Sequence, residues 1–132
     1  MRYYVIQCTH KEPNCKDRRD KVSIAADLLR GHTEAVILAR LIQNDSYGYE
    51  INKAISTLSG KRFELKEATL YTAFKRLEDS GCITSYWGDE STGARRKYYR
   101  ITEMGRDVLC RLLEEWRETK DIMDKLLEGQ GK

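Results

Sequence analysis

The chain has 132 residues, of which 40% are hydrophobic and 34% are charged, and its formal net charge is +3. This length predicts one compact domain and leaves no room for a second core, while a near-neutral charge neither requires nor excludes nucleic acid. No apolar run approaches the roughly 18 residues that cross a bilayer, which excludes a transmembrane protein. Four dispersed cysteines without a secretory leader predict a cytoplasmic protein.

The N-terminal third of the chain predicts an arm followed by helices. Residues 1–20 contain the only proline and show no sustained period, so we expect an N-terminal arm of unknown role. A short amphipathic helix is possible over 21–29, and a stronger helix over 34–43 follows a break at Gly31. Asn44, Asp45 and Ser46 are expected to end that helix and to cap the next.

Two further helices are predicted from apolar residues that recur every three or four positions. The first, closed by Gly60, is expected to bury one face made of Ile51, Ala54, Ile55 and Leu58. The second begins near Glu67 and ends at Gly81, a typical C-terminal cap. Its buried face is expected to hold Leu70, Ala73, Phe74 and Leu77.

The last third predicts a hairpin and one long helix. Strands are expected over 83–87 and 96–101, joined by a polar, glycine-bearing loop. Thr102 can cap a final helix that runs to about Glu128 and is longer than this core needs. The predicted fold is therefore mainly α with a small β-hairpin. It is a winged helix-turn-helix DNA-binding domain over 21–102, followed by a C-terminal dimerisation and effector helix over 103–132.

The outer surface of the helix near 67–80 is short, polar and basic. Small residues permit close approach to a major groove, hydroxyls can bond to phosphates or bases, and Lys75 and Arg76 supply charge. A solvated helix face is the alternative, because an exposed pair of charges is common. The hairpin favours duplex DNA, since its adjacent cations suit a phosphate backbone. The predicted DNA-binding residues are Ala68, Thr69, Tyr71, Thr72, Lys75, Arg76, Arg95, Arg96 and Lys97.

The final helix carries an apolar seam of the coiled-coil type, which predicts a partner helix and, most economically, a homodimer. The seam consists of Leu109, Leu112, Trp116, Thr119, Met123 and Leu126, accompanied by Leu113 and Leu127. Polar groups interrupt it beside Trp116. A gap between two symmetry-related indoles could therefore hold a flat aromatic guest, although Trp116 as a simple interface anchor is an equal alternative.

Several sequence runs together carry a family resemblance: 47–51 (YGYEI), 68–71 (ATLY), 75–78 (KRLE) and 95–102 (RRKYYRIT). Through them, residues 28–128 resemble the PadR family of transcriptional regulators. Residues 64–99, including SYWGDES, are similar to a small subgroup that contains a multidrug-binding repressor of a drug-efflux transporter. The resemblance implies a repressor whose dimer encloses a flat apolar pore with paired tryptophans, and Trp116 matches that tryptophan.

The same resemblance implies a set of pore-lining residues. Lys120 stands where the subgroup has an acidic residue that helps to receive cationic drugs, which shifts the expected preference toward neutral or anionic aromatics. No cofactor is expected. The ligand-binding residues implied are Leu28, Ala35, Leu113, Trp116, Thr119, Lys120 and Met123.

Three other functions compete with this interpretation. A metal sensor could bind zinc through Cys8, His10 and Cys15, although their spacing matches no paired zinc knuckle. A winged-helix protein without an effector is the second alternative. An enzyme is the third, and it has little support because His32, interpreted as a helix-start residue, has no nucleophile at a recognisable spacing. Cys82 and Cys110 are expected to be buried apolar residues.

Overall fold

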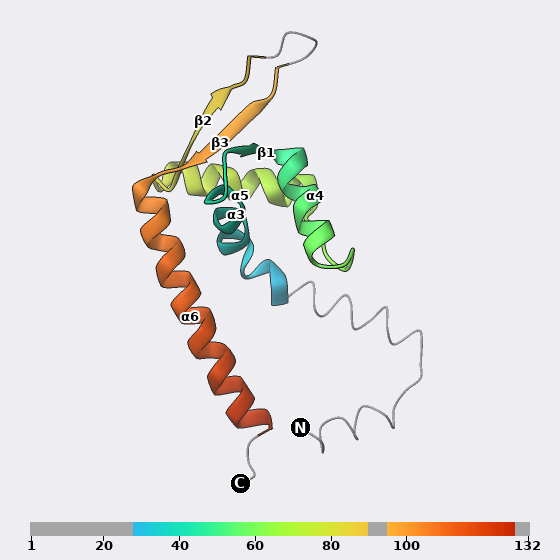
Figure 1. The fold of residues 1–132 in the computed structure, drawn as a ribbon, viewed down its shortest axis with the longest axis vertical. Coiled ribbons are helices and arrows are strands. Elements are labelled where there is room, and N and C mark those ends of the chain that lie inside the picture. Colours follow the sequence, from blue (N-terminus) through green and yellow to red (C-terminus); the bar gives the residue numbers. More distant parts are fainter. Residues whose placement is uncertain (1–27, 90–94, 129–132) are drawn as a thin grey trace.

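The computed structural model describes residues 28–89 and 95–128, and the predicted arm and most of the helix expected over 21–29 lie outside them. Residues 28–30 are helical, and seven further elements follow along the chain (Figure 1). These elements are α3 (Thr33–Leu41), β1 (Ser46–Tyr47), α4 (Gly48–Leu58), α5 (Glu67–Asp79), β2 (Ile83–Trp87), β3 (Lys97–Ile101) and α6 (Glu103–Leu127).

A compact core joins the first three of these helices to one face of the sheet. The predicted inner face of α5 is confirmed, because Leu70, Ala73, Phe74 and Leu77 are each at most 2% exposed. Phe74 stacks on Tyr99 of β3 with ring centroids 4.0 Å apart, which fastens α5 to the sheet. Full burial of each large apolar side chain stabilises the fold by about 1.5–3 kcal/mol.

The predicted helix boundaries rest on local chemistry that the structure bears out. Gly60 and Gly81 adopt φ of 69° and 83°, a left-handed conformation that most side chains disfavour, just beyond the ends of α4 and α5. Thr102 caps α6 by accepting a hydrogen bond from the Gly105 amide at 3.0 Å. His32 occupies the N-cap position of α3, which agrees with its interpretation as a helix-start residue.

The sheet differs from the predicted two-stranded hairpin. Ser46–Tyr47 forms an extra strand, and the strand order is β1-β3-β2 with both pairings antiparallel. The expected cap from residues 44–46 was wrong: the N-cap of α4 is Tyr47, which makes no side-chain cap bond. Ser46 is held in the sheet opposite Tyr99, and its hydroxyl instead donates to Glu50 at 2.6 Å.

Helix α6 leaves the core gradually and extends away from it (Figure 1). Its first turns are packed, with Gly105 and Leu109 buried, whereas its later apolar residues are exposed. Cys110 is exposed, contrary to the prediction, because it follows Leu109 by about 100° around the helix and so turns off the buried face. Cys82 is buried as expected.

Leu58 is a second correction to the predicted core. It is 68% exposed, although the periodicity placed it on the buried face of α4. It is the last residue of that helix, and its side chain lies beyond the core that covers Ile51 and Ile55. No helix in the described parts of the chain combines the length and apolar character that a membrane crossing requires.

Candidate nucleic-acid interface

The outer face of α5 carries the predicted polar and basic residues. Ala68, Thr72, Lys75 and Arg76 are exposed, Thr69 is partly buried, and Tyr71 is 44% exposed. Gly48 makes room for that ring, because a Cβ at Gly48 would meet the Tyr71 hydroxyl at 2.5 Å. The start of α4 therefore lies directly beside the exposed face of α5.

Both basic residues of α5 have carboxylate partners. Arg76 Nε donates to Glu34 Oε2 at 2.8 Å, which links α5 to the first turn of α3. Lys75 lies 3.6 Å from Asp79 one turn later, and both of these side chains are largely exposed. Water and salt screen such surface pairs, so a phosphate can compete for either cation.

We define the wing as β2 and β3 together with Arg95 and Arg96. Its adjacent cations do not all point the same way. Arg95 lies 5.5 Å from the Trp87 ring, and Lys97 lies 5.9 Å from the Tyr99 ring. Arg96 lies 4.7 Å from the ring of Tyr47 on the opposite face of the sheet. These ring contacts place Arg96 on the face opposite Arg95 and Lys97, so both faces of the wing carry positive charge.

A row of tyrosines crosses the outer face of the sheet, away from α5. Tyr47, Tyr98 and Tyr86 occupy paired positions on β1, β3 and β2, and Tyr86 stacks on Tyr98 with centroids 5.6 Å apart. Arg100 lies over the ring of Tyr86 at 4.9 Å. This row gives the outer face a continuous aromatic surface.

Asp45 joins that row to the helical body. Its Oδ2 accepts hydrogen bonds from the Tyr86 hydroxyl at 2.6 Å and from Arg100 Nε at 3.1 Å. The hydrogen bond to Asp45 raises the pKa of Tyr86, which keeps its hydroxyl protonated as the donor. Sequence reasoning missed this link, and it missed Glu34, because neither carboxylate stands near its partner in the chain.

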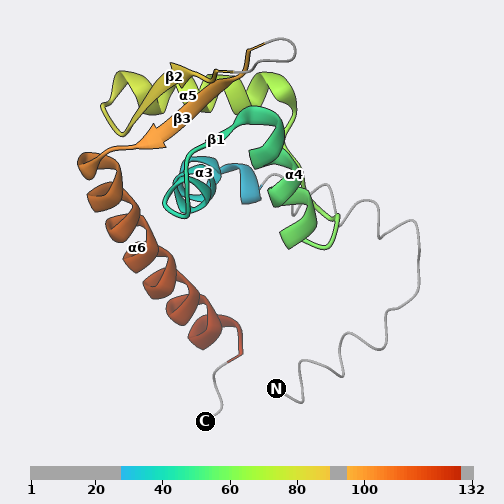
Figure 2. The same ribbon diagram turned by 45° about the horizontal axis from the view of Figure 1, so that its top comes forward.

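The inner face of the sheet is tied to α5 by polar as well as aromatic contacts. Ser85 donates to Glu78 of α5 at 2.7 Å, next to the stacked pair of Tyr99 and Phe74. Burial raises the pKa of Tyr99 to about 12, so it remains neutral there. The wing and α5 are consequently held as one unit (Figure 2).

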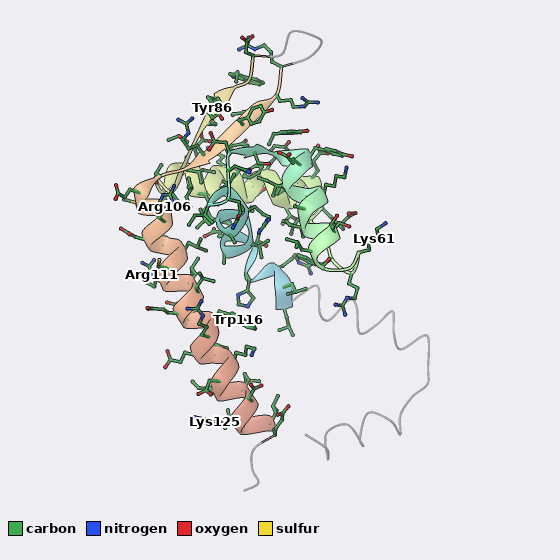
Figure 3. All side chains as sticks on the ribbon, viewed as in Figure 1. Lys61, Tyr86, Arg106, Arg111, Trp116 and Lys125 are labelled. Atoms are coloured by element: carbon green, nitrogen blue, oxygen red, sulfur yellow. The ribbon has the colours of Figure 1, made fainter. Side chains whose placement is uncertain are left out.

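The residues expected to bind a ligand lie on and opposite α6. Trp116 is 45% exposed, and its ring meets His32 edge-on with centroids 5.3 Å apart, so α6 contacts the start of α3 (Figure 3). Leu28 is exposed and Ala35 is partly buried. The four remaining residues are exposed on α6 and form, with Trp116, what we call the α6 stripe: Leu113, Trp116, Thr119, Lys120 and Met123.

The zinc alternative is not addressed by the structure, because Cys8, His10 and Cys15 lie outside the described residues. Within residues 28–89 and 95–128, no three His, Cys, Asp or Glu side chains come together as a possible metal site.

Comparison with known proteins gives a consistent result. The model of the "Transcriptional regulator PadR-like family" matches residues 37–111. A solved structure of a transcriptional regulator from Clostridium thermocellum is 45% identical, with TM-score 0.72, covering 78% of this chain and 97% of that one. A PadR family transcriptional regulator from Eggerthella lenta is 31% identical, with TM-score 0.73, covering 88% and 100%. An uncharacterized protein X of Lysinibacillus sphaericus is 46% identical over 80% of this chain and 97% of its own length.

Proposed function

Because the chain belongs to the PadR-like family of transcriptional regulators, which bind DNA and are not enzymes, we propose that it is a homodimeric repressor whose operator complex is released by a planar hydrophobic ligand. In this proposal residues 21–102 bind the operator in the cytoplasm and residues 103–132 form the dimer. The observation that carries it is the exposed basic face of α5 held in one unit with a cationic wing.

Operator binding is proposed to use α5 in the major groove. The exposed small and hydroxyl-bearing residues of α5 support close approach to base edges, and Lys75 and Arg76 support phosphate contact. Arg95, Arg96 and Lys97 extend the basic surface along the wing. The contact residues proposed are the same nine that the sequence indicates.

Dimerisation is proposed to bury the far end of α6. Trp116, Ile122, Met123, Leu126 and Leu127 are large apolar side chains that are each at least 44% exposed. An apolar face that runs from Trp116 to Leu127 is typical of an interface helix. A two-fold operator would match a two-fold protein.

The ligand is proposed to lie against Trp116 between the paired α6 helices. The half-exposed indole offers a stacking surface, and Leu113 and Met123 offer an adaptable apolar wall. Lys120 is the only charged member of the α6 stripe, which favours neutral or anionic aromatics over cations. Leu28 and Ala35 would close the site from the side of α3.

A gel-shift titration with duplex DNA from upstream of the protein's own gene, repeated with a panel of aromatic compounds, tests both parts of the proposal. We expect a salt-dependent shift that one or more compounds reverse. In a Trp87→Phe variant, where Trp116 is the remaining tryptophan, the same compounds should quench the fluorescence. Operator binding with no quenching by any compound would favour the effector-independent alternative.

A further inference from the structure

One aromatic side chain of the wing has no role in the surface described so far. Trp87, the last residue of β2, is 56% exposed, and the wing projects beyond the helices (Figure 1). We propose that Trp87 is a DNA-contacting residue that packs on a deoxyribose and base edge of the minor groove beside the segment occupied by α5. This inference rests on the proposed operator surface and extends it.

Strand alternation places Trp87 on the same face as the contacts to α5. Ser85 and Tyr99, which face each other across β2 and β3, both contact α5. Trp87 and Lys97 are the next pair on that face, and both are exposed. The Trp87 indole therefore lies on the sheet face that contacts α5, but outside the core.

Two cations neighbour Trp87. The guanidinium of Arg95 lies 5.5 Å from the ring centroid, and Lys97 is its cross-strand partner. In the described part of the chain neither cation forms an ion pair with a carboxylate. By contrast, Asp45 accepts bonds from both Tyr86 and Arg100 on the outer face.

An indole flanked by two such cations matches the chemistry of a DNA groove. Phosphates line both edges of the minor groove, and its floor offers sugar and base surfaces against which apolar side chains pack. Arg95 and Lys97 can bind the flanking phosphates while the indole covers the apolar strip between them. One indole beside two cations that form no ion pair within the described residues disfavours a basic or purely apolar partner.

Two measurements on the full chain test this contact. The first is ¹⁹F NMR of the protein labelled with 5-fluorotryptophan, whose two signals are assigned by Trp87→Phe and Trp116→Phe. A labelled duplex from upstream of the gene should shift or broaden the Trp87 signal at the same stoichiometry at which fluorescence anisotropy reports binding. A Trp87 signal that stays constant through saturation overturns the inference.

The second measurement compares affinities across a salt series. Trp87→Ala should weaken duplex binding roughly tenfold, and Trp87→Phe should weaken it less, because a phenyl ring retains part of the apolar surface that the indole packs on the groove. The slope of log affinity against log salt should stay unchanged in Trp87→Ala, since no charge is lost, but should fall by about one in Arg95→Ala. A matched control, Leu58→Ala, removes another exposed apolar side chain outside this surface and should bind normally.

The outcomes separate this inference from the function on which it rests. If the wild-type protein binds the duplex and Trp87→Ala binds it equally tightly, the Trp87 contact is overturned and the proposed repressor function stands. A reduced salt slope in Trp87→Ala would mean that the indole only positions Arg95, which also overturns the direct contact. Absence of any duplex binding by the wild type at low salt would instead remove the proposed function itself.

Discussion

The body of the molecule and the far end of α6 use apolar residues in opposite ways. In the body, Phe74, Ile37 and Leu38 are at most 1% exposed and hold helices and sheet together. Along α6 beyond Leu112, Met123 and Leu126 follow an equally regular spacing but remain exposed. The same sequence pattern therefore produces a core in one region and an exposed apolar surface in the other, and in the proposed dimer the second copy covers that surface.

Substitution of Phe74 should have the largest effect, and it should act on folding. Phe74→Ala removes a fully buried ring that stacks on Tyr99, so we expect the free energy of unfolding to fall by about 3–5 kcal/mol. Urea titration followed by circular dichroism measures this loss. Leu58→Ala, the exposed control, should change stability by less than about 0.5 kcal/mol. Similar losses in both variants would contradict the assignment of the core.

A charge on the far end of α6 should act on association instead. Met123→Glu adds a negative charge to the α6 stripe, and we expect the dissociation constant of the dimer to rise roughly 100-fold, because each dimer must bury two carboxylates that Lys120, three positions earlier, compensates only in part. Sedimentation equilibrium measures the dissociation constant, and circular dichroism should show an intact fold. Arg111→Glu, which replaces a positive with a negative charge away from the stripe, serves as the control. A dimer that is equally tight in both variants would argue against α6 as the interface.

Much of the fold followed from local signals in the sequence. The inner face of α5, the glycines that end α4 and α5, and the Thr102 cap depend on residues within one or two helical turns, and each prediction was confirmed. The strand β1 was missed because two residues carry no periodicity of their own. Ser46 and Tyr47 become a strand only through pairing with β3, some 50 positions later.

The candidate site divides in the same way. Exposure of the basic residues on α5 follows from helical periodicity, which the sequence contains. Their partners do not follow: Glu34 binds Arg76 and Asp45 binds Arg100 across 42 and 55 positions of the chain. Carboxylates at such separations meet only once the helices have packed, so no spacing in the sequence marks them.

Removal of single cations from the body should weaken DNA binding without changing the dimer. Lys75→Ala and Arg96→Ala should each reduce operator affinity about three- to tenfold at moderate salt, and each should lower the salt slope by about one, because each removes one phosphate contact. Fluorescence anisotropy over a salt series measures both quantities. Lys125→Ala removes an exposed lysine near the end of α6 and should leave both unchanged. Identical slopes in all three proteins would place the DNA elsewhere.

The smallest expected effect lies where the two regions meet. Glu34 binds Arg76 of α5. Two positions before Glu34, His32 contacts Trp116 of α6. Glu34→Gln should tighten operator binding about threefold, because it frees Arg76 and removes a negative charge beside the phosphates. Asp79→Asn is the matched control, since Asp79 pairs more loosely with the more exposed Lys75, and it should change affinity less than twofold. Anisotropy at low salt measures both affinities, and weaker binding by Glu34→Gln would mean that the pair orients Arg76 for DNA and does not compete with it.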